Sequence, residues 1–119
     1  MLKINVLYGN EIDKNIYFNH WSILLEFKKF FYESGIIFNF YNLITKNITD
    51  CDFLFLSSKF FSIENNLISN KSIEIIDNLK KKNKNIIWFD LRDSAGTTQF
   101  EIIDLVKAYV KKQFYKNRD

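Results

Sequence analysis

The chain has 119 residues, of which 47% are hydrophobic and 26% charged, a composition typical of a folded globular protein and unlike that of a disordered one. A chain of this length buries roughly two-thirds of the surface that its unfolded form exposes, so we expect residues 1–119 to form a single domain. The net charge is only +3 and arginine is scarce. Because specific nucleic-acid interfaces depend on the planar guanidinium group, we expect no nucleic-acid partner.

Cys51 is the only cysteine and His20 the only histidine, which excludes an intrachain disulfide and a cysteine-based metal cluster. We therefore expect neither a metal site nor a cofactor. The flanking carboxylates of Asp50 and Asp52 disfavour a thiolate, so Cys51 is interpreted as a structural thiol. The amino terminus lacks the apolar region of a signal peptide, and no window approaches about 18 uninterrupted apolar residues. The sequence thus predicts a cytoplasmic protein without a membrane span.

The first part of the chain predicts two strands joined by a helix. Residues 3–8 are a short β-prone run that we interpret as a buried strand. From His20 to Ser34 the apolar residues recur at the spacing of one helix face, and Gly35 is expected to end that helix in a left-handed conformation. Residues 36–41 are then predicted to be the second strand.

The second part predicts two more strands, at residues 53–56 and 86–89, with a helix between Asn70 and Lys84. Thr98 and Glu101 match a capping box, which predicts the start of a last helix. The apolar face of that helix continues through Phe100, Ile103, Val106, Val110 and Phe114.

Helix-bearing connections between successive strands favour parallel pairing with right-handed crossovers. We therefore predict a three-layer, Rossmann-like α/β sandwich with a small, mainly parallel sheet of about four strands. Strands that are apolar on both faces agree with this, because helices cover both faces of a parallel sheet. The predicted last helix has no strand after it, which suggests that the chain is the amino-terminal half of a larger enzyme.

In an open parallel sheet, ligands bind beyond the carboxyl ends of the strands. Polar residues that follow the predicted strands would meet there, and we name as the ligand-binding set Asn10, Glu11, Ser57, Ser58, Asp90, Arg92, Asp93, Ser94 and Thr97. The sequence singles out no catalytic residue among them.

Several members of this set, and His20 outside it, have two interpretations. The turn from Ser94 to Thr98 could present backbone N–H groups to an anion or a sugar hydroxyl, or it could only cap a helix. Asp90 and Asp93 could bind a metal or act as a base, or Asp93 could pair with Arg92. His20 could be a general base or a polar surface residue. Neither a G-x-G-x-x-G nor a Walker pattern is present, so dinucleotide or NTP binding is poorly supported.

The run Trp88–Glu101, followed by Val110–Gln113 and Lys116–Asp119, resembles the amino-terminal domain of two-Rossmann-domain (GT-B-like) bacterial glycosyltransferases of surface-polysaccharide biosynthesis. The predicted strand Phe53–Leu56 with Ser57 and Ser58 contributes to this resemblance. The resemblance covers nearly the whole chain and implies an acceptor-side domain that is inactive without a nucleotide-sugar-binding second domain. Its partners would be a glycan acceptor and that second domain.

Two other functions remain open. A flavodoxin-like or receiver-like interaction module without catalytic activity would need a specific partner, although the end of the first strand lacks the acidic pair with which a phospho-receiver binds Mg²⁺. A small hydrolase or transferase would depend on Asp90 or Asp93. An exposed apolar surface would also allow a homodimer.

Overall fold

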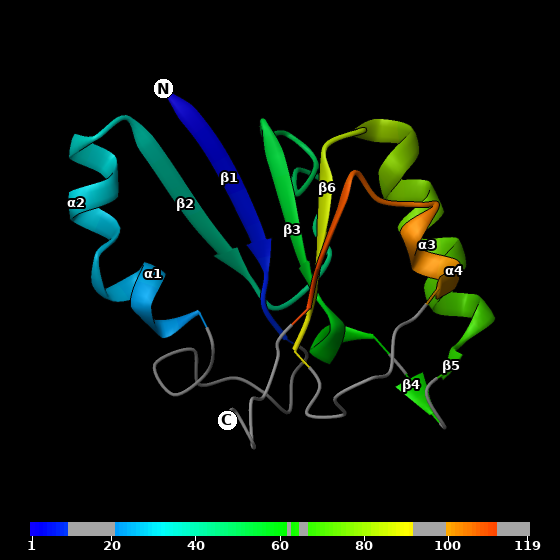
Figure 1. Ribbon diagram of the computed structural model, residues 1–119. Helices are drawn as coiled ribbons and strands as arrows, with labels where there is room; N and C mark the ends of the chain where they lie inside the picture. Colours follow the sequence, from blue (N-terminus) through cyan, green and yellow to red (C-terminus); the bar gives the residue numbers. More distant parts are fainter. Residues whose placement is uncertain (10–20, 62, 65–66, 92–99, 112–119) are drawn as a thin grey trace, which may run out of the picture.

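The computed structural model describes residues 1–9, 21–61, 63–64, 67–91 and 100–111, and a five-stranded parallel sheet lies at its centre (Figure 1). In spatial order the strands are β2 (Ile36–Tyr41), β1 (Leu2–Leu7), β3 (Phe53–Ser57), β6 (Ile86–Asp90) and β7 (Ala108–Lys111). Numbered along the chain, this is the 2-1-3-4-5 order of flavodoxin-like, doubly wound folds. The predicted α/β class is confirmed.

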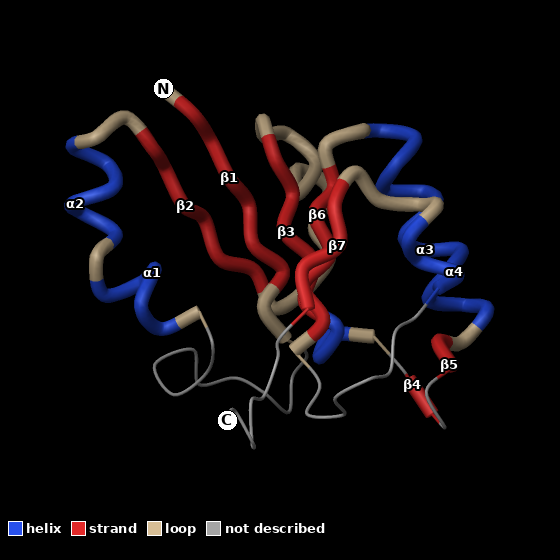
Figure 2. Tube along the Cα trace, viewed as in Figure 1, coloured by secondary structure: helices blue, strands red, loops and turns tan. Residues whose placement is uncertain are grey.

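Helices cover the sheet on two sides (Figure 2). Helices α1 (Ser22–Glu26) and α2 (Lys28–Glu33) lie on one side, and α3 (Asn70–Lys82) and α4 (Phe100–Ile103) lie on the other. A small antiparallel hairpin, formed by β4 (Ile63–Glu64) and β5 (Leu67–Ile68), precedes α3. The single helix expected from His20 to Ser34 is divided at Phe27 into α1 and α2, and Gly35 ends α2 with a φ of 93°, as predicted.

Side chains that alternate along the strands pack into two separate hydrophobic cores, one on each face of the sheet. On the α3 side, Leu54 and Leu56 pack with Trp88 in one apolar cluster. On the α1 and α2 side the cluster is largely aromatic, and the ring centroids of Phe55 and Phe89 lie 4.9 Å apart. Because both faces of the sheet are covered, its strands need apolar residues at odd and even positions alike, which explains their continuous rather than alternating hydrophobicity.

The last predicted helix is wrong beyond its first turn. Helix α4 ends at Ile103, and Val106 lies between it and β7, while Val110 belongs to β7 itself. The chain turns through a Leu105 N–H to Ile102 carbonyl bond of 2.9 Å, and the Lys107 N–H donates to the Ile86 carbonyl at 2.8 Å, which aligns β7 beside β6. Backbone pairing with β6 therefore overrides the helical spacing of the apolar residues.

The capping-box prediction has a different outcome for each residue. Thr98 lies outside the described residues. Phe114, the last residue of the predicted apolar helix face, also lies outside them. A carboxylate oxygen of Glu101 accepts a hydrogen bond from the backbone N–H of Ile68 at 3.2 Å. Glu101 thus links α4 to the hairpin that contains β5.

Asparagine side chains hydrogen-bond the linker between β2 and β3, residues 42–52, to the sheet and to the turn before β6. The Asn83 amide, just after α3, donates to the carbonyls of Thr49 and Cys51 at 3.1 and 2.9 Å, while its oxygen accepts from the Asn85 N–H at 2.8 Å. On β1 the buried Asn5 amide donates to the Ile48 carbonyl at 2.8 Å. These bonds satisfy backbone groups of a segment that has no regular secondary structure.

Replacing Asn83 with alanine should lower the free energy of unfolding by about 1–3 kcal/mol, because two partly buried carbonyls lose their donor. Urea denaturation measures the difference. Asn78→Ala is the matched control: Asn78 is exposed on α3, and the change should stay within about 0.5 kcal/mol. Equal effects of the two substitutions would contradict the role of Asn83.

Burial raises the pKa of the Cys51 thiol and outweighs the lowering contributions of the Asn5 backbone and Lys3, while the nearby Asp52 and Asp50 raise the pKa by smaller amounts. The predicted disfavoured thiolate is confirmed, with burial as its main cause. Since folding favours the protonated thiol, its contribution to stability is present below the ordinary thiol pKa of about 8.5 and is lost as the pH rises above it.

We expect iodoacetamide to alkylate Cys51 more slowly in the folded chain than in the urea-unfolded chain at pH 8, because less thiolate is present. The rate for the folded chain should keep rising at pH values where that for the unfolded chain has levelled off. Mass spectrometry of timed samples gives both rates. A folded-state rate equal to or above the unfolded one would refute the structural interpretation of this thiol.

Candidate functional site

The strand order reverses between β1 and β3. The chain passes from β1 to β2 on one side and continues with β3, β6 and β7 on the other. In doubly wound folds the carboxyl ends of the strands beside such a reversal form the usual ligand site. Here those ends are Tyr8 and Gly9 after β1, and Ser57 and Ser58 at the end of β3.

Both serines are buried, and their hydroxyl oxygens bind backbone N–H groups. Ser57 Oγ accepts from the Lys59 N–H at 3.1 Å and so caps a short 3-10 turn, Ser58–Phe60. Ser58 Oγ accepts from the Leu91 N–H at 3.0 Å. Ser58 therefore joins the end of β3 to the first residue after β6, while the side chain of Lys59 lies exposed.

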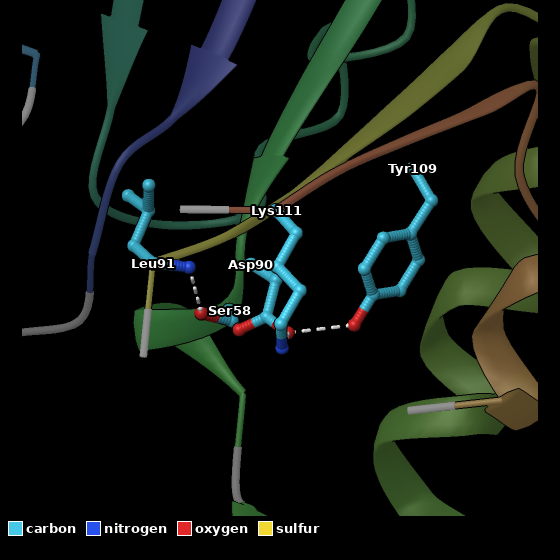
Figure 3. A network of polar contacts seen from close by, with 5 residues as sticks. All are labelled: Ser58, Asp90, Leu91, Tyr109 and Lys111. Atoms are coloured by element: carbon cyan, nitrogen blue, oxygen red, sulfur yellow. Dashed lines mark hydrogen bonds and ion pairs between the residues drawn. The ribbon is translucent and has the colours of Figure 1, made fainter. Parts of the chain in front are cut away.

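The carboxylate of Asp90 ends β6 and is only 1% exposed. The Tyr109 hydroxyl donates to its Oδ2 at 2.7 Å, and the Lys111 ammonium lies 3.3 Å from the same oxygen (Figure 3). A carboxylate removed from water costs several kcal/mol unless a charge and hydrogen bonds compensate for it. Both compensating groups come from β7, so the last strand completes this part of the edge.

Tyr109 and Lys111 are absent from the predicted ligand-binding set, because both fall on the predicted last helix; in the structure they belong to β7. Their signal was nevertheless present, since Tyr109 and Val110 are good strand formers and side chains at positions 109 and 111 point to the same face of a strand. Register confirms this arrangement: Trp88 pairs with Tyr109, and Asp90 pairs with Lys111.

Of the predicted ligand-binding set, the structure brings Ser57, Ser58 and Asp90 to one edge of the sheet, as expected. Their contact with a ligand stays a prediction, and the described bonds give all three a structural role as well. The rest of the set lies outside the described residues: Asn10, Glu11, Arg92, Asp93, Ser94 and Thr97. His20 also lies outside them.

In the described part of this edge, the buried carboxylate of Asp90 is paired with the Lys111 ammonium. No group of three or more His, Cys, Asp or Glu side chains that could hold a metal ion occurs within the described ranges. Within these same ranges, no helix is long and apolar enough to cross a membrane.

The network around Asp90 predicts strong coupling between Asp90 and Tyr109. Tyr109→Phe should cost about 1.5–3 kcal/mol of unfolding free energy, because it removes a hydrogen bond to a charged group. In an Asp90→Asn background the same change should cost at least about 1 kcal/mol less. Urea denaturation of the four proteins in this double-mutant cycle measures the coupling, and strictly additive losses would contradict it.

A matched control uses Tyr32, which is exposed on α2. The substitution Tyr32→Phe also removes one phenolic hydroxyl, but it should change the unfolding free energy by less than about 0.5 kcal/mol in either background.

Comparison with known proteins identifies no family for this chain: no protein-family model matches the sequence, and no curated protein is significantly similar to it. What the structure establishes is a five-stranded parallel α/β domain of Rossmann-like type.

Proposed function

We propose that this chain is the acceptor-side domain of a glycosyltransferase of surface-polysaccharide biosynthesis, which acts only together with a nucleotide-sugar-binding second domain. The observation that carries the proposal is the position in the fold of the run Trp88–Glu101, which resembles these enzymes. This run includes Asp90, the residue where β6 ends at the carboxyl edge of the sheet, and Ser58 Oγ accepts a hydrogen bond from the N–H of the next residue, Leu91.

Within the described part of the edge, the pairing of charges supports a neutral ligand. Asp90 is buried and paired with Lys111, so neither group offers an unbalanced charge to a phosphate or a divalent cation. Sugar hydroxyls instead require short polar side chains and backbone N–H groups. Such groups are abundant in the sequence after β6, where Ser94, Gly96 and Thr97 follow one another closely.

A stand-alone interaction module is the second candidate, and the strand order favours it, because 2-1-3-4-5 is also the order of flavodoxin-like and receiver-like domains. The phospho-receiver form is disfavoured by the residues at the two central strand ends. Strand β1 is followed by Tyr8 and Gly9, and β3 ends at Ser57, where acidic side chains would be required to bind Mg²⁺.

Nuclear magnetic resonance titration of the ¹⁵N-labelled chain with neutral mono- and oligosaccharides tests the proposal. We expect shifts of the Ser57, Ser58 and Leu91 amide signals, because these residues lie at the carboxyl edge. The double substitution Ser94→Ala and Thr97→Ala should weaken binding by about tenfold, the effect of losing two hydrogen bonds of modest strength. Ser34→Ala, at an exposed position after α2, is the control and should bind like the unmodified chain.

The saccharide titration separates the two candidates, and an activity measurement adds a second test of the proposal. The chain alone should transfer no sugar from nucleotide sugars to glycan acceptors, because the donor site belongs to the second domain. Robust transfer by the chain alone would contradict the proposal. Absence of shifts with every saccharide would do so as well, and would favour the interaction module.

A further inference from the structure

We draw no further inference here: the strongest candidate, the exposed apolar residues Ile23, Phe27 and Phe30 along helices α1 and α2, carries none because nothing in the structure shows what covers them.

Discussion

The buried carboxylate of Asp90 is the constraint on which the carboxyl edge of the sheet depends. A negative charge that is almost completely withdrawn from water needs a cation and hydrogen-bond donors beside it. Tyr109 and Lys111 supply them from positions 19 and 21 residues further along the chain. The chain meets this requirement by returning beside β6 as the parallel strand β7. The same arrangement fixes the position of Asp90, where β6 ends.

Elements with local signals could be predicted from the sequence. Gly35 stops α2 because its positive φ suits glycine, and the predicted second strand coincides with β2. The helix between Asn70 and Lys82 has the expected apolar spacing, and it ends where Asn83 turns its side chain to the linker before β3. The final segment could not be predicted in this way. The three- and four-residue spacing of its apolar positions fits a helix, whereas its strand state depends on β6 and on Asp90, which are distant in sequence.

The candidate site shows a similar division. The rule that carboxyl ends of parallel strands share one edge places Ser57, Ser58 and Asp90 together, and the structure agrees. Sequence alone could not reveal that the Ser57 and Ser58 hydroxyls accept hydrogen bonds from backbone N–H groups. Nor could it reveal that Asp90 is buried rather than open to solvent. These residues stabilise the edge through the bonds described. One doubly wound topology serves many activities. The proposal of a sugar acceptor therefore rests on the resemblance of the run Trp88–Glu101 and on the Asp90–Lys111 pair, not on the fold.

Asp90 is enclosed because the chain returns as a strand beside β6. Nuclear Overhauser contacts and amide exchange of residues 105–111 test it most directly. We expect contacts between the backbones of Trp88 and Tyr109, together with slow exchange of those β7 amides that hydrogen-bond to β6. Sequential helical contacts that continue from Ile103 through Lys111, with none to β6, would contradict it.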